Sequence, residues 1–265
     1  MPLLRGILGT ALYLFCHLTM AGPPPRIAIV IDDIGYQAGH DRAILAMDPR
    51  LAIAIIPESP AASRLARQAA SQHREVLIHL PLAGLFHDNC RPALTCVGLD
   101  WSAGRMYEHL TEALDQVEGA IGINNHQGSR FTGDARAVGN LIDSIDRLGR
   151  HHGRALFVLD SRTVPNSLLE RKALKAGLSA SRRHVFLDHR NEPEAIEMAW
   201  QDLLDLARFH GSAIAIGHPR TNTIGFLNRA LPALVDQGVE LVPISALMRR
   251  STNPGTSDSL LTSSP

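Results

Sequence analysis

Residues 26–35 have the sequence Arg-Ile-Ala-Ile-Val-Ile-Asp-Asp-Ile-Gly, an apolar run that ends in two adjacent carboxylates. Ile and Val favour extended backbone, and apolar residues at both odd and even positions predict a strand that is covered on both faces. Strands of this kind belong to parallel sheets, because crossover helices cover both faces of such a sheet. The segment therefore predicts an α/β fold with Asp32 and Asp33 at the end of its first strand.

The same kind of segment recurs along the chain. Short runs rich in Ile, Val and Leu alternate with amphipathic stretches at helical spacing, which predicts a mainly parallel sheet. Eight strands with crossover helices favour a closed or nearly closed (β/α) barrel, and a doubly wound open sheet is the alternative. The predicted strands are 26–32, 51–57, 75–80, 120–125, 155–160, 184–188, 212–217 and 239–243. The predicted helices are 63–73, 102–117, 134–148, 191–210 and 222–237.

The first 21 residues have the order of a secretory signal peptide. Arg5 precedes an apolar run from Ile7 to Met20, and Ala21 ends the run in front of three prolines at 23–25. A charged, then apolar, then small-residue segment is typical of a cleaved signal, and the run is short for a membrane span. We expect a protein exported to the periplasm or extracellular space, with no stable membrane span after cleavage; an uncleaved anchor is the alternative.

Composition limits the classes of function. The 265 residues carry 26 Lys+Arg and 26 Asp+Glu, and only 5% are aromatic. A chain without a basic field and with few rings is not expected to bind nucleic acid. No linker divides residues 22–250, so we expect a single domain there and a disordered tail at 251–265. Composition does not indicate the oligomeric state.

Two cysteines lie in a long predicted loop at 84–99. In an oxidising compartment, Cys90 and Cys96 are close enough in sequence to form a disulfide that holds the loop. Two unpaired thiols are the alternative. A zinc site made from this pair is not expected, since the chain has no second pair.

Polar residues follow most of the predicted strands. Each one alone has a structural explanation, as a turn, a helix cap or a core histidine. Their repetition indicates an active site, because the carboxyl ends of barrel strands meet at one rim. The positions in chain order are Asp32, Asp33, His79, His126, Asp160, Asp188, His189 and His218.

The residue types at this rim suit metal-assisted hydrolysis. One carboxylate with His79 and His126 is a ligand set for zinc or a similar divalent ion. Such an ion polarises a carbonyl and lowers the pKa of bound water. His218 has the intrinsic pKa of a general acid, and Arg162 is placed to orient a substrate or pair with a base. Surface turns are the alternatives for both residues.

Five motifs in this order resemble the divergent polysaccharide deacetylases, a branch of the NodB-like carbohydrate esterase superfamily. They are Ile-Asp-Asp-Ile-Gly at 31–35, Ile-His-Leu-Pro at 78–81, Asn-His-Gln-Gly-Ser-Arg at 125–130, Asp-Ser-Arg-Thr at 160–163 and Ile-Gly-His-Pro at 216–219. The resemblance implies a distorted (β/α) barrel of about 7–8 mostly parallel strands. It also implies metal-dependent removal of N- or O-acetyl groups from sugar polymers.

The resemblance assigns roles to individual residues. It implies Asp32 as the base and Asp33 as a metal ligand, with His79 as the first histidine of the metal motif. Ala83 stands where the family's usual second histidine would be, and we expect His126 to take its place.

The resulting hypothesis is a hydrolase with zinc as the expected ion and an acylated cell-envelope carbohydrate as substrate. Its candidate catalytic residues are Asp32, His218, Asp160 and Arg162, and its candidate ligands are Asp33, His79 and His126. Two alternatives stay open. One is a non-catalytic envelope barrel that binds carbohydrate or a partner, which Ala83 favours. The other is a metal-free glycoside hydrolase that uses two of the aspartates at about 5–10 Å separation.

Overall fold

A computed structural model describes residues 22–85 and 95–250. The predicted signal peptide, Cys90 of the predicted disulfide and the predicted tail lie outside the described residues, so these remain predictions. Among the described helices, none combines the length and apolar character that crossing a bilayer requires.

The described strands form one sheet, and all pairings between them are parallel. Their order is β6-β5-β4-β3-β2-β1-β8-β7, and β9 pairs with β1. The sheet curls, but its end strands β6 and β7 do not pair with each other, so the predicted barrel is confirmed in an open, half-barrel form. The strands are β1 (Arg26–Ile34), β2 (Ala52–Ile55), β3 (Val76–Leu82), β4 (Gly122–Gln127), β5 (Phe157–Asp160), β6 (Ala180–Arg182), β7 (Val185–Phe186), β8 (Ser212–Gly217) and β9 (Glu240–Leu241).

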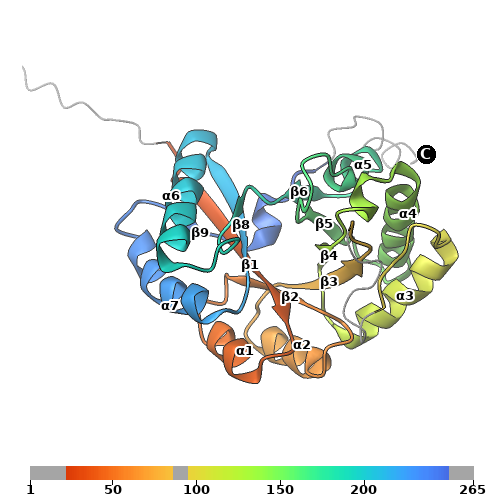
Figure 1. The fold of residues 1–265 in the computed structure, drawn as a ribbon, viewed down its shortest axis with the longest axis horizontal. Coiled ribbons are helices and arrows are strands. Elements are labelled where there is room, and N and C mark those ends of the chain that lie inside the picture. The colour runs from red at the N-terminus through yellow and green to blue at the C-terminus, as the bar shows by residue number, and fades with distance from the viewer. Residues whose placement is uncertain (1–21, 86–94, 251–265) are drawn as a thin grey trace, which may run out of the picture.

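The helices lie along the outside of the curled sheet (Figure 1). Ser102 and Asp134, the residues at which two helices were predicted to begin, accept hydrogen bonds from the first turns of α3 and α4. The helices are α1 (Ala38–Leu45), α2 (Ala62–Ser71), α3 (Ala103–Gln116), α4 (Ala135–His151), α5 (Leu169–Lys175), α6 (Pro193–His210) and α7 (Thr221–Ala230), with short 3-10 turns η1 (Phe131–Gly133), η2 (Pro232–Leu234) and η3 (Ile244–Leu247).

Strand alternation divides the core into two parts. In β1, Ile27 and Ile29 pack in the large outer core with the helices, whereas Ala28 and Val30 belong to a separate inner cluster. The inner cluster fills the curl of the sheet and consists of Ala28, Val30, Ala52, Ala54, Leu77, Phe157, Leu159, Ile214, Ile216, Val242, Ile244 and Leu247. Side chains two residues further along these strands therefore face the same interior, at the carboxyl end of the sheet.

Several predicted boundaries differ from the structure. The predictions omitted β6, α1 and α5, and they extended the helix that begins near 222 to 237. That helix ends at Ala230, because Pro232 has no N–H to continue it and starts η2 instead. β6 has the sequence Ala-Ser-Arg, so its strand conformation comes from pairing with β5 rather than from local apolar pattern.

Candidate metal centre and its acid–base neighbours

A bulge in β1 brings both of its aspartates into the interior. Between Ile31 and Ile34 the register to β2 shifts, and Asp33 has a positive φ of 56°. Asp32 continues the inward series, and the bulge turns Asp33 inward as well. A left-handed conformation costs a non-glycine residue about 1–3 kcal/mol. Gly35 completes the turn at φ 128°, where a Cβ atom would lie only 1.9 Å from the hydroxyl oxygen of Ser59.

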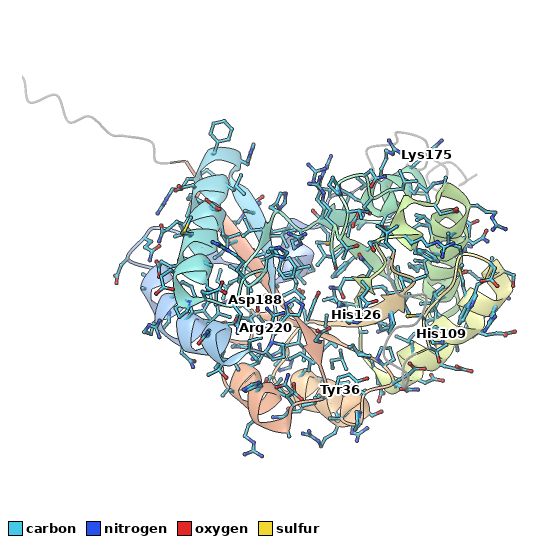
Figure 2. The ribbon with its side chains drawn as sticks, viewed as in Figure 1. Tyr36, His109, His126, Lys175, Asp188 and Arg220 are labelled. Atoms are coloured by element: carbon cyan, nitrogen blue, oxygen red, sulfur yellow. The ribbon has the colours of Figure 1, made fainter. Side chains whose placement is uncertain are left out.

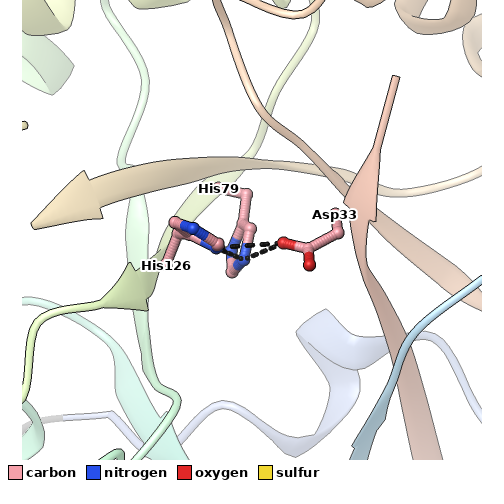
Figure 3. Close-up of side chains that lie close together, drawn as sticks. All are labelled: Asp33, His79 and His126. Atoms are coloured by element: carbon pink, nitrogen blue, oxygen red, sulfur yellow. Dashed lines mark hydrogen bonds and ion pairs between the residues drawn. The ribbon is translucent and has the colours of Figure 1, made fainter. Parts of the chain in front are cut away.

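Asp33, His79 and His126 form a compact set of ligand atoms, here called the metal triad (Figure 3). Oδ1 of Asp33 lies 3.2 Å from Nε2 of His79 and 3.0 Å from Nδ1 of His126. The two ring nitrogens are 3.2 Å apart. Ligand atoms at about 2.0–2.1 Å from a tetrahedral zinc ion are separated by about 3.3 Å, so the triad has nearly the spacing of three ligands.

The electrostatics of the triad also fit a cation. Oδ1 of Asp33 is buried without a hydrogen-bond partner, and a bound cation would satisfy it. Burial lowers the pKa of His79, but Asp32 and Asp33 outweigh it and raise that pKa to about 9. Burial raises the pKa of Asp33, yet the contacts with His126 and His79 bring it well below its usual range. The carboxylates therefore favour positive charge at this point.

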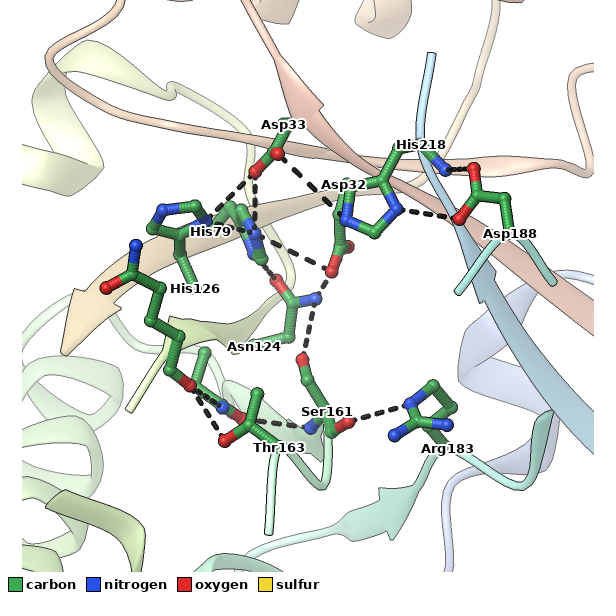
Figure 4. Close-up of polar contacts among 12 residues, drawn as sticks. Asp32, Asp33, His79, Asn124, His126, Ser161, Thr163, Arg183, Asp188 and His218 are labelled. Carbon is green, nitrogen blue, oxygen red and sulfur yellow. Dashed lines mark hydrogen bonds and ion pairs between the residues drawn. The ribbon is translucent and has the colours of Figure 1, made fainter. Parts of the chain in front are cut away.

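Asn124 connects the metal triad to Asp32 (Figure 4). Its Oδ1 lies 2.9 Å from Nδ1 of His79. For the neutral form of the ring that could bind a metal ion, we assign the His79 proton to Nδ1, which leaves Nε2 with a lone pair directed at the triad. Its Nδ2 donates to Oδ1 of Asp32 at 2.8 Å and to Oγ of Ser161 at 3.3 Å. One buried amide thus sets both the tautomer of a ligand and the orientation of the second carboxylate.

Asp32 is buried but free of the triad's closest contacts. Its Oδ2 lies 3.6 Å from Nε2 of His79. Burial raises the pKa of Asp32, partly offset by His79, His218 and the hydrogen bond from Asn124. A carboxylate with a raised pKa accepts a proton more readily than an exposed one.

Asp188 and His218 form a hydrogen-bonded pair on the other side of Asp33. Asp188 Oδ1 is 2.9 Å from Nδ1 of His218, and Asp188 Oδ2 accepts from the backbone N–H of His218 and the hydroxyl of Thr223, both at 2.7 Å. Nε2 of His218 lies 3.9 Å from Oδ2 of Asp33, so it points to the site. Burial lowers the pKa of His218, but Asp188 and Asp32 outweigh it and raise that pKa. In Figure 2, Asp188 and His126 lie in the middle of the molecule, inside the arc of helices.

Residues 29–248 match the family described as divergent polysaccharide deacetylase. The chain belongs to that family. A relative from Haemophilus influenzae, named only as an uncharacterized protein, is 36% identical over 243 residues, which cover 92% of this chain and 82% of that protein. The uncharacterized protein YibQ of Escherichia coli is 33% identical over 253 residues, which cover 93% of this chain and 74% of that protein.

Solved structures agree on the fold of this family member. The uncharacterized protein ATU2773 of Agrobacterium tumefaciens matches with a TM-score of 0.78 at 22% identity, over 85% of this chain and 90% of that one. A mutant of BA3943, described as a CE4 family pseudoenzyme with restored enzymatic activity, matches with a TM-score of 0.52 at 14% identity. The match covers 84% of this chain and 67% of that one. These likenesses show that the half-barrel is of the NodB type.

The second histidine of this family member comes from a different strand than the usual motif implies. His126 is the second-last residue of β4 and pairs in register with Pro81, two residues after His79 in β3. This pairing sets the two imidazole rings 5.0 Å apart, edge to face. The position of Ala83 therefore does not leave the triad short of a histidine.

The structure places Asp160 and Arg162 outside this network. Leu159 faces the inner cluster, so Asp160, the next residue, faces the other way. Its oxygens accept from the backbone N–H of Arg162 at 2.8 Å, the hydroxyl of Ser167 at 2.7 Å and the backbone N–H of Glu170 at 3.3 Å. Among the contacts of the described residues, neither Asp160 nor Arg162 reaches the triad, and their catalytic roles stay predictions.

Two residues of the network, Asn124 and Ser161, were not among the predicted site residues, and Asp188 was predicted at the rim but was given no role in the metal-dependent mechanism. Asn124 and Ser161 face inward by the same alternation as Leu77 and Leu159. Asp188 follows β7, which pairs with β8, the strand that precedes His218. Alternation within each strand was the signal that could have found Asn124 and Ser161.

Proposed function

We propose that the chain is a metal-dependent hydrolase that removes N- or O-acetyl groups from an acetylated cell-envelope carbohydrate. The carrying observation is one interior site that combines the metal triad, the separate carboxylate of Asp32 and the Asp188–His218 pair. Membership in a carbohydrate-acting family supports the sugar as substrate.

The triad would hold the ion through Oδ1 of Asp33, Nε2 of His79 and Nδ1 of His126. Three protein ligands with open positions are typical of catalytic zinc. When bound, such an ion supplies Lewis-acid polarisation of the acyl carbonyl and a lowered pKa for water. Asn124 keeps the His79 nitrogen available for this role.

Asp32 and His218 would move the protons. Asp32 accepts a proton from the attacking water as the oxygen of that water bonds to the acyl carbon. His218 donates a proton from Nε2 to the leaving nitrogen or oxygen as the acyl bond breaks, and Asp188 stabilises its charged form through Nδ1. The products are acetate and a free amine or hydroxyl on the sugar.

We also propose that the protein acts outside the cytoplasm, since residues 1–21 have the order of a signal peptide. Cell fractionation of the full chain tests this. Recovery in the periplasm or medium is expected, and recovery in the cytosol would contradict it.

Acetate release from acetylated oligosaccharides tests the proposed activity. The full chain, supplied with zinc, is expected to release acetate, and Asp32→Asn is expected to lower the rate of release by about 10²–10⁴-fold while it keeps the metal. A wild-type protein that holds metal but releases no acetate from any acetylated sugar would overturn the proposal in favour of a non-catalytic binding barrel. Sugar cleavage without metal would favour the carboxylate-only glycosidase.

A further inference from the structure

A cavity lies near the open edge of the sheet. It has a volume of about 380 Å³ and is lined by residues of β6, β8, α5 and the chain after η3, with the last residue of α6. β6 and β8 are not neighbours in the strand order of the sheet. Its titratable residues are Glu170, Arg182, His184, His210 and Arg249, and this cavity is here called the cationic cleft.

Cations outnumber carboxylates in the cationic cleft. Arg182 and Arg249 both reach the one carboxylate, Glu170, with nitrogen–oxygen distances of 3.7 Å and 3.2 Å. The Glu170 side chain is only 12% exposed, whereas those of Arg182 and Arg249 are 47% and 66% exposed. A guanidinium has five N–H donors, so one shared carboxylate does not saturate two of them.

His184 adds a donor of fixed direction. Its Nδ1 accepts the backbone N–H of Ile214 at 3.0 Å, which assigns the ring proton to Nε2. Burial lowers the pKa of His184, and the charges that add to this effect are all cations, with Arg182 and His210 the largest. His184 is therefore a neutral hydrogen-bond donor on the wall of the cleft, with positively charged side chains around it.

One short segment links this cleft to the acetyl-removing site. Arg182 and His184 line the cleft, and Arg183 between them donates from Nε to the carbonyl of Ser161 at 2.8 Å. Further along, the ring of Phe186 lies 5.3 Å from that of His218. Residues 182–186 thus contribute side chains to the cleft and contacts to the proposed active site.

We propose that the cationic cleft binds a carboxylate or phosphate group carried by the carbohydrate chain, so that the substrate is an acidic glycan. This inference rests on the proposed function and names its substrate class. Arg182 and Arg249 would form charge-assisted hydrogen bonds to the anionic group, and His184 would donate a neutral one. Glu170 holds the two guanidiniums in place and limits the net charge.

Calorimetric titration of the full chain with two oligosaccharides of equal length tests the cleft. The probes are an oligogalacturonate, which is acidic, and a neutral N-acetylglucosamine oligomer. The double variant Arg182→Gln/Arg249→Gln is expected to bind the acidic probe about tenfold more weakly. Glu170→Gln is expected to bind it more tightly, because both guanidiniums lose their internal partner.

The control is Arg208→Gln, which removes an arginine paired with Asp205 on α6 and is expected to change neither titration.

Tighter binding of the acidic probe by Glu170→Gln cannot result from loss of structure, so it supports the cleft even if the double variant folds poorly. Equal binding of the two probes, or weaker binding of the acidic probe by Glu170→Gln, would overturn the proposal. Binding of inorganic phosphate as tight as that of the oligogalacturonate would also overturn the proposal, because it would indicate a site for free anions. Acetate release is assayed separately, so its absence would contradict the proposed function while the charge response of the cleft still supported anion binding.

Discussion

β1 and β5 both carry aspartate at or near the carboxyl end of a buried apolar run, yet only the aspartates of β1 reach the interior site. In β5 the alternation is regular, so Leu159 faces inward and Asp160 faces the loop that follows it. In β1 a bulge interrupts the alternation, and both Asp32 and Asp33 face the interior. The comparison shows that position at a strand end is not enough, because the direction of each side chain decides its role.

The largest expected effect distinguishes the aspartates of the two strands directly. Asp33→Ala removes a ligand of the metal triad and is expected to weaken zinc affinity by more than about 100-fold. Asp160→Ala is expected to keep that affinity but to lower the free energy of unfolding by about 1–3 kcal/mol, since the N–H groups of Arg162 and Glu170 lose their acceptor. Competition with a chromogenic chelator measures the first, and thermal unfolding measures the second.

The same pair of variants can contradict the comparison. If Asp160→Ala lost zinc as completely as Asp33→Ala, the predicted catalytic role of Asp160 would be restored. Unchanged stability of Asp160→Ala would show that its three hydrogen bonds do not hold the loop.

The two aspartates of β1 are expected to differ from each other. Asp32→Asn keeps the shape of the side chain. It also keeps an oxygen that accepts the hydrogen bond from Asn124 when the new amide turns that oxygen toward Asn124. Zinc content is therefore expected to stay near the wild-type level. Acetate release is expected to fall by about 10²–10⁴-fold, the usual contribution of a general base. Steady-state kinetics with zinc-saturated protein measure this fall. Activity near the wild-type level would remove Asp32 from its assigned role.

A smaller effect is expected at Asn124, which bridges Asp32 and His79. Asn124→Ala removes the acceptor for Nδ1 of His79 and is expected to weaken zinc affinity by about 10–100-fold. Ser161→Ala is the matched control, because it removes only the longer 3.3 Å contact of the same amide. Equal losses in the two variants would mean that the tautomer of His79 is not set by Asn124.

Asp188→Asn is expected to shift a pH profile rather than abolish activity. The pKa of His218 is raised, and the protonated form is the proton donor, so activity is present below this pKa and is lost as pH rises through it. Without the negative charge of Asp188, the pKa falls, and the alkaline limb of the kcat/KM profile moves to lower pH. Thr223→Val, which removes only a hydrogen bond to Asp188, is expected to shift it less. An alkaline limb that does not move would assign it to another group.

Buried strands were predictable where the sequence supplies its own apolar run, as in residues 26–32 and 212–217. β6 was not, because its Ala-Ser-Arg sequence becomes a strand only by pairing with β5. The triad was predictable from the types and order of Asp33, His79 and His126. Alternation within β4 could have placed Asn124 inward, but its link to His79 was not predictable, because only the register of β4 against β3 shows this amide beside His79.

Elemental analysis of the purified full chain tests the central claim most directly, that Asp33, His79 and His126 together hold a metal ion. The protein is prepared without chelator and without affinity-tag histidines, in wild-type, His126→Ala and Asp160→Ala forms. The account predicts about one equivalent of zinc or a similar ion in the wild type and in Asp160→Ala, and little in His126→Ala. A wild-type protein that takes up no metal even after zinc is added, or a His126→Ala variant that keeps a full equivalent, would contradict it.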